Sequence, residues 1–186
     1  LMLYSTAVST FKELLSQEVP RIMDHLFEPT LEMITTNMSD YPEHRVHFFK
    51  FLQSANTFCF YGLFSIPANH QKLVVDSIVW AFKHTERNIS EAGLEILQEL
   101  LQNVSGAENY SQPFYQSFLL PLVQDVMGIM TDRLHKSGFK LQAAIVMNLF
   151  HMVQAGGVKV PLYDPAQHPG IADNAMFLKE HVGHSL

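Results

Sequence analysis

Apolar residues recur at helical spacing along almost the whole of this 186-residue chain. Val74, Ile78 and Phe82 form one ridge of a helix, and Phe48 and Leu52 begin another. The strict alternation of apolar and polar residues that marks a half-buried strand is nowhere sustained. The sequence therefore predicts an all-α fold.

The apolar stripes divide the chain into helices that pair in order. The pairs span residues 1–38, 41–85, 88–135 and 138–186, and each is close to the roughly 40 to 47 residues of a two-helix HEAT repeat. One pair cannot bury its own apolar face, so we expect the pairs to stack as a single α-solenoid segment without an internal domain boundary. Residues 156–173 contain three prolines and three glycines and are expected to form a surface loop.

Local signals refine this picture. Residues 85–88 are predicted to join two antiparallel helices, and Asn88 with Glu91 resembles a capping box that opens the second of them. Pro29 and Pro121 fall inside predicted helices, where a missing N–H and a crowded ring should kink each helix or split it.

Composition excludes several classes of partner. The chain is 47% hydrophobic and 16% charged, which is typical of a globular protein. Its net charge of −6 argues against direct nucleic-acid binding and favours a basic protein surface as partner. No apolar run approaches the roughly 18 residues that a membrane span needs. The single cysteine, Cys59, allows no internal disulfide and fits a reducing compartment. Because the chain begins and ends inside apolar-periodic segments, we expect it to be a piece of a longer protein.

Chemical motifs are sparse. His44 and His47 are three residues apart, as are His181 and His184, but neither pair has a third metal ligand nearby. Cys59 lies on an apolar stripe, where a buried and unreactive thiol is expected. We therefore predict no catalytic site, no metal and no cofactor. A metal-dependent enzyme that uses the histidine pairs is the alternative that elemental analysis would test.

Five segments carry a resemblance to a known family. They are DYPEHRVHFF (40–49), KLVVDSIVWAFKHTERNISEAGLEILQELLQN (72–103), FYQSFLLPLVQDVMGIMTD (114–132), GFKLQAAIVMNLF (138–150) and DNAMFL (173–178). Together they resemble the C-terminal HEAT repeats of the karyopherin-β nuclear export receptors, in particular the exportin that recognises leucine-rich export signals. The resemblance runs essentially end to end and is most specific in residues 77–88.

The resemblance implies a function in transport rather than catalysis. Such receptors bind Ran-GTP and export-signal cargo proteins in the nucleus, cross the nuclear pore through phenylalanine-glycine nucleoporins, and shuttle between nucleus and cytoplasm. The cargo groove of the family lies in repeats outside this segment, so Cys59 does not take the role of the groove cysteine. Neither direct nucleic-acid binding nor membrane insertion is implied. A HEAT scaffold subunit of a phosphatase or kinase complex would show the same periodicity and is the alternative function.

Two sets of contact residues are expected from this architecture. The second helix of each repeat, over residues 18–37, 67–84, 109–133 and 174–186, should line the concave side, where its acids would face Ran. These acids are Asp24, Glu28, Asp76, Asp125 and Asp132. On the outer side, Phe49 is expected to be exposed among Arg45, Gln53 and Asn56. The nucleoporin candidates are Phe49, Phe60 and Tyr61.

Overall fold

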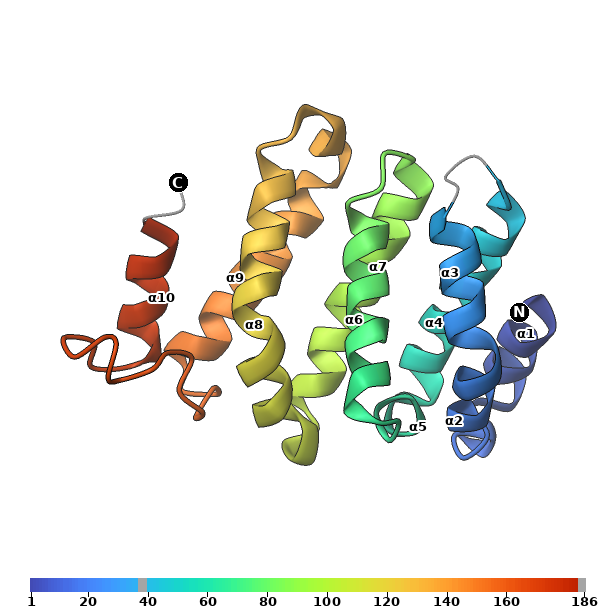
Figure 1. Ribbon diagram of the computed structural model, residues 1–186, viewed down its shortest axis with the longest axis horizontal. Helices are drawn as coiled ribbons and strands as arrows, with labels where there is room; N and C mark the ends of the chain where they lie inside the picture. Colours follow the sequence, from blue (N-terminus) through green and yellow to red (C-terminus); the bar gives the residue numbers. More distant parts are fainter. Residues whose placement is uncertain (37–39, 184–186) are drawn as a thin grey trace. The chain divides into compact units, whose positions relative to one another are not determined.

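The computed structural model describes residues 1–36 and 40–183 of the chain. Within these ranges every regular element is a helix and no strand is present (Figure 1). The all-α prediction is confirmed, and the helices pack as in a HEAT-like α-solenoid. The elements are α1 (Met2–Phe11), η1 (Lys12–Leu15), α2 (Val19–Ile22), η2 (Met23–Phe27), α3 (Glu28–Thr36), α4 (Pro42–Phe58), α5 (Phe60–Phe64), α6 (Ala68–Phe82), α7 (Arg87–Ser105), α8 (Glu108–Met130), η3 (Arg133–Gly138), α9 (Phe139–Gln154) and α10 (Asn174–Gly183).

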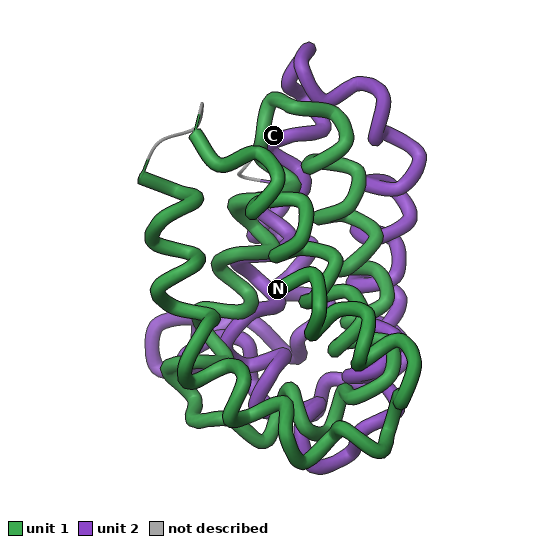
Figure 2. Tube along the Cα trace, turned by 90° about the vertical axis from the view of Figure 1, so that its right-hand side faces the viewer, with its two compact units in different colours: residues 1–100 green, residues 101–186 purple. Residues whose placement is uncertain are grey.

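The helices group into two compact units, residues 1–100 and 101–186 (Figure 2). The division between them falls inside α7, at a point where both Leu100 and Leu101 are buried. The first unit contains α1 to α6 and most of α7. The second contains the end of α7, then α8, η3, α9 and α10.

In the first unit α4 is the central helix. On one side it packs against α1 and α3, and the ring of Phe48 lies 4.8 Å from that of Phe27. On the other side Phe49 stacks on Trp80 of α6, with the ring centroids 6.0 Å apart, and the Asn56 side-chain amide donates a hydrogen bond to the Ile96 carbonyl of α7. Because α4 has neighbours on both sides, its buried face is wide and includes seven of its 17 residues, from Arg45 to Asn56.

The helical conformation is interrupted at Cys59, between α4 and α5. The backbone of Cys59 leaves the helical region, with φ −134° and ψ 34°, and its amide bonds to the Ala55 carbonyl before α5 begins. Gly62 of α5 approaches the end of η1 so closely that a Cβ atom there would lie 2.1 Å from the Ser16 carbonyl oxygen. The absence of a side chain at Gly62 therefore permits this packing.

Pro29 changes the helix in which it lies. Its missing N–H leaves the His25 carbonyl without the usual intrahelical donor, and the five residues of η2 just before α3 form a π-helical turn. The helical stretch from residue 19 to residue 36 runs through α2, η2 and α3 without a gap, so Pro29 changes the hydrogen-bond pattern of its helix but does not split it. Residues 37 and 38 of the predicted first repeat lie outside the described part of the chain. Pro121 differs, because α8 runs through it as one continuous α-helix.

The joint between α6 and α7 lies slightly earlier than predicted. Helix α6 ends at Phe82, and α7 begins at Arg87, so Asn88 lies inside the first turn and is not the N-cap that the capping-box pattern predicted. The Glu86 carbonyl accepts the amides of Ile89 and Ser90 instead. Tertiary contact explains the shift, because the Ser90 hydroxyl donates to the Phe82 carbonyl at 2.8 Å and ties the two helix ends together.

The second unit is built on α8 and α9, with α10 packed on α9. The segment between α9 and α10 contains no regular helix, as predicted for residues 156–173. The side chains of Gln112 and Asn174 hold it in place. The side-chain oxygen of Gln112 accepts hydrogen bonds from the backbone amides of Lys159 and Val160. Its side-chain nitrogen donates a hydrogen bond to the Gly157 carbonyl.

Candidate functional site

The histidine pairs and Cys59 form no reactive centre in the described part of the chain. No group of three or more metal-binding side chains is found among the described residues. His44 is exposed and His47 half-buried on α4, and His181 bonds to Gln124 at 2.7 Å. His184, the second member of that pair, lies outside the described residues. Cys59 is buried as predicted. Burial, aided by the nearby Glu13 charge, raises the pKa of its thiol, which disfavours the reactive thiolate.

The sequence predicts no apolar run long enough to span a membrane. Among the residues that the structure describes, no helix combines the length and the apolar character that a membrane crossing requires.

Phe49 does not lie on an exposed face. It is 2% exposed, between the ring of Phe48 at 5.1 Å and that of Trp80. Arg45 and Asn56, predicted beside it on the outer surface, are also buried. The expectation of an exposed Phe49 was wrong. The face of α4 that the sequence pattern assigned to solvent is the face on which α6 and α7 pack.

The other two aromatic candidates differ in exposure. Phe60 is buried against Phe64, with the rings stacked at 4.9 Å. Tyr61 is 63% exposed, and its ring meets that of Phe60 edge-on at 5.5 Å. Of the three aromatic residues, Tyr61 alone presents a large accessible surface.

The three candidate acids of the first unit lie on neighbouring helices. Asp24 of η2 and Glu28 of α3 line a small cavity of about 10 Å³ together with His70 of α6, and the His70 Nδ1 atom lies 3.4 Å from the Asp24 carboxylate. Asp76 lies farther along α6, where its carboxylate accepts a 2.6 Å bond from the Lys72 ammonium group. All three acids are exposed. The structure therefore brings Asp24 and Glu28 together beside His70, whereas Asp76 pairs with Lys72 on α6.

The two acids of the second unit have different settings. Asp125 is half-buried on α8. Asp132 caps η3, because its carboxylate accepts the Leu134 amide at 3.0 Å and contacts the His135 Nδ1 atom at 3.1 Å. The bond from the Leu134 amide, with a smaller contribution from His135, holds the pKa of Asp132 below its usual range. Asp132 thus has a structural use within the chain.

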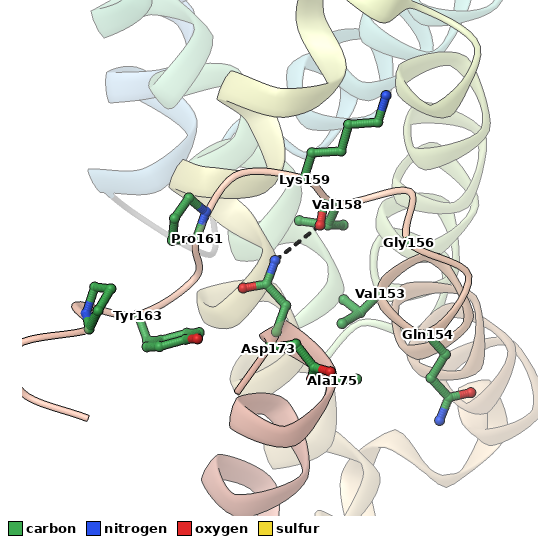
Figure 3. Close-up of a pocket in the computed structure, with 11 residues that line it drawn as sticks. Val153, Gln154, Gly156, Val158, Lys159, Pro161, Tyr163, Asp173 and Ala175 are labelled. Atoms are coloured by element: carbon green, nitrogen blue, oxygen red, sulfur yellow. Dashed lines mark hydrogen bonds between the residues drawn. The ribbon is translucent and has the colours of Figure 1, made fainter. Parts of the chain in front are cut away.

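A hollow beside the loop was not anticipated from the sequence. Its volume is about 390 Å³, and Figure 3 shows Val153, Val158, Tyr163 and Ala175 among the side chains that line it. Asn174 fixes its wall by donating to the Val158 and Val160 carbonyls and accepting the Leu162 amide. A larger apolar hollow of about 790 Å³ adjoins α9 and α10 and shares Val153 and Ala175 with the first. The larger hollow is lined mostly by apolar side chains and suits side-chain packing better than catalysis.

Sequence reasoning missed the polar residues that organise these contacts. Gln112 and Asn174 are single amides in otherwise ordinary helices, and their partners lie 45 and 16 residues away. Arg45 is 1% exposed, and its guanidinium lies 3.9 Å from the Glu86 carboxylate. A charged residue is rarely fully buried, so only the folded chain identifies such a position.

Helix pairs stacked in HEAT fashion define a helical-repeat protein. Comparison with known families narrows this class. The family model described as "CRM1 C terminal" matches residues 1–186, and the chain belongs to that family.

Relatives of the chain are found in several eukaryotes. It is 45% identical over 183 residues to Exportin-1 of Schizosaccharomyces pombe and 43% identical over 182 residues to Exportin-1 of Dictyostelium discoideum. It is also 43% identical over 184 residues to Protein EXPORTIN 1B of Arabidopsis thaliana. Each match covers 98% of this chain and 17% of the relative. The chain thus spans about one sixth of the length of these proteins.

Proposed function

We propose that this chain forms part of a nuclear export receptor, which carries cargo with leucine-rich signals out of the nucleus together with Ran-GTP. The observation that carries the proposal is the family match over residues 1–186, with relatives named as exportins at up to 45% identity. The segment acts by binding and by extending the solenoid. The chemistry of GTP hydrolysis belongs to Ran.

The proposal divides the partners among parts of the receptor. Cargo binds through repeats outside this segment. The segment itself contacts Ran and phenylalanine-glycine nucleoporins, and the receptor shuttles between nucleus and cytoplasm. Neither nucleic acid nor a membrane is a direct partner, which agrees with the net charge of −6. Tyr61 is the preferred nucleoporin contact because its ring is accessible, whereas Phe49 and Phe60 are buried.

Electrostatics supports the assignment of the acids to Ran. Asp24, Glu28 and Asp76 are exposed on neighbouring helices of the first unit, and exposed carboxylates raise the encounter rate with a basic surface. Asp125 and Asp132 stay in the proposal as weaker candidates, since Asp125 is half-buried and Asp132 already caps η3. Single surface ion pairs contribute only about 0 to 1 kcal/mol, so the effect should be collective.

The test is stopped-flow association of GTP-loaded Ran with the full-length receptor. Exchange of Glu28→Lys and Asp76→Lys together should slow association severalfold at low salt and much less at high salt, because exposed charges are screened over about 8 Å at physiological ionic strength. Glu43→Lys, an exposed acid at the start of α4, is the matched control and should leave the rate unchanged.

The same assay tests the wider proposal. The receptor should bind GTP-loaded Ran and not the GDP form. Binding of neither form, combined with capture of a phosphatase or kinase catalytic subunit, would favour the alternative of a HEAT scaffold subunit. If the GTP form binds but the double variant associates at the wild-type rate at every salt concentration, the acids have no part in the contact and the export function still stands.

A further inference from the structure

The corner formed by η3 and the start of α9 differs in charge from the rest of the chain. Residues 133–140 contain Arg133, Lys136 and Lys140 and no acid, in a protein whose net charge is −6. All three cations are exposed, and within residues 1–36 and 40–183 no ion pair involving them is found. We call this stretch, residues 133–140, the basic corner.

Large apolar side chains are exposed among these cations. Leu134 is 69% exposed and Phe139 is 51% exposed. Farther along α9, Met147 is 70% exposed. Exposed apolar groups bordered by charged ones mark protein-binding surfaces more often than scattered single residues do, and aromatic residues and arginine are enriched at interface centres.

The backbone places the three cations on one side of the corner. Residues three apart eclipse one another in a 3-10 helix, so Arg133 and Lys136 share a side of η3. Gly138 and Phe139 keep right-handed helical dihedral angles through the junction, which puts Lys140 one turn beyond Lys136.

The opposite side of the corner is fixed to the second unit. His135 is buried, and its carbonyl accepts a 3.0 Å hydrogen bond from the Gln142 side chain, which is fully buried. Asp132, the nearest acid in the sequence, is held by the Leu134 amide and by His135. The basic corner is thus anchored on its inner side by His135, and Asp132 caps the start of η3.

We propose that the basic corner is a docking surface for an acidic segment of a partner protein that also carries an apolar side chain. The three cations would pair with carboxylates, and Phe139 and Leu134 would cover the apolar group. This contact has the opposite polarity to the one proposed for Ran, which uses the acids of the chain, and it does not depend on that proposal.

A protein segment suits this surface better than an anionic membrane or a nucleic acid. A membrane or a nucleic acid presents an extended anionic surface to the whole chain. The net negative charge of the chain would oppose its approach to such a surface. A short peptide bound at the basic corner would not reach most of the acids of the chain. Salt also screens charges that lie more than about 8 Å apart.

Fluorescence anisotropy with the 186-residue chain tests the proposal. The probe is a fluorescein-labelled peptide with Leu-Phe at its centre and four glutamates on each side. It should bind saturably and more weakly as salt is raised. The triple change Arg133→Glu, Lys136→Glu and Lys140→Glu should weaken binding about tenfold or more, because three ion pairs are lost and each new glutamate repels the peptide.

Matched controls separate the corner from general charge effects. The control variant exchanges three exposed lysines elsewhere, at Lys50, Lys159 and Lys179, for Glu. It has the same net charge as the test variant and should bind nearly as well as the wild type. Phe139→Ala should weaken binding severalfold while retaining the salt dependence, and circular dichroism should show equal helix content in every variant.

Four results would overturn the proposal. They are absence of binding, equal loss in the two triple variants, equal binding of a peptide with glutamine in place of glutamate, and tighter binding to phosphatidylserine vesicles that the corner variant abolishes. The last result would make the corner a membrane contact.

Discussion

His84 lies just after the end of α6 in a setting that disfavours a charged imidazole. It is buried, its ring lies 4.9 Å from that of Trp80, and its Nδ1 atom accepts the Glu86 amide at 3.0 Å. Burial lowers the pKa of His84 below the ordinary 6.5, and Arg45 adds to this effect while Glu86 opposes it. A protonated ring would lose its bond from the Glu86 amide, since both ring nitrogens would then be donors.

This setting predicts a pH dependence of stability. Because the folded pKa lies below the unfolded one, the unfolded chain binds more protons as the pH falls. The contribution of His84 to stability is therefore complete above about pH 6.5 and is lost as the pH falls through the folded pKa. Urea unfolding at about pH 7.5 and about pH 5.5 measures this loss, and His84→Gln should lose less stability over that range than the wild type. Equal losses in both proteins would show that His84 does not contribute.

At the scale of single elements, the loop between α9 and α10 is held by two side-chain amides. Asn174 makes three hydrogen bonds to the loop backbone, and Gln112 makes three more. A long segment without helix or strand is usually mobile, but these bonds satisfy its backbone groups and hold it against the helices.

Asn174→Ala should release this loop. The change leaves the Leu162 amide and the Val158 and Val160 carbonyls without their partner, which should cost about 1–3 kcal/mol of unfolding free energy. Hydrogen exchange should become faster at the Leu162 amide by a larger factor than at the amides of α8. Gln154→Ala, an exposed amide at the end of α9, is the control. Unchanged exchange at Leu162 in Asn174→Ala would mean that packing alone holds the loop.

At the scale of the whole molecule, α7 belongs to both compact units. Trp80 is the only tryptophan and lies in the first unit, so its fluorescence reports that unit, whereas far-ultraviolet circular dichroism reports both. A continuous helix should couple the two units, so the two signals should change together during urea unfolding.

A break in α7 should separate these signals. Gln102→Pro places a proline at an exposed position near the division between the units and should cost about 3 kcal/mol. The dichroism of this variant should then show two transitions, of which Trp80 fluorescence follows one. Gln102→Ala should retain a single transition. Two transitions already in the wild type would show that α7 does not couple the units.

Much of the fold could be predicted from the sequence because its causes are local. The spacing of Val74, Ile78 and Phe82 reports one face of a helix whatever lies beside it. Pro29 removes a donor from its own helix, and its effect appears in the adjacent turn η2. The prolines and glycines of residues 156–173 likewise act on their own backbone. The local sequence therefore determined three features of the fold. They are the all-α class, the position of the loop and the altered helix before Pro29.

The tertiary structure decided which faces remain open for a partner. The sequence of α4 cannot show that α6 and α7 pack over Arg45, Phe49 and Asn56, because that burial depends on residues 40 positions away, such as Ile96. It also cannot show that Asp132 is occupied as a cap, or that His135 turns inward and leaves Arg133 and Lys136 on the surface. Periodicity records which residues prefer to avoid water, whereas exposure depends on which helices reach them, and that is a property of the packed chain alone.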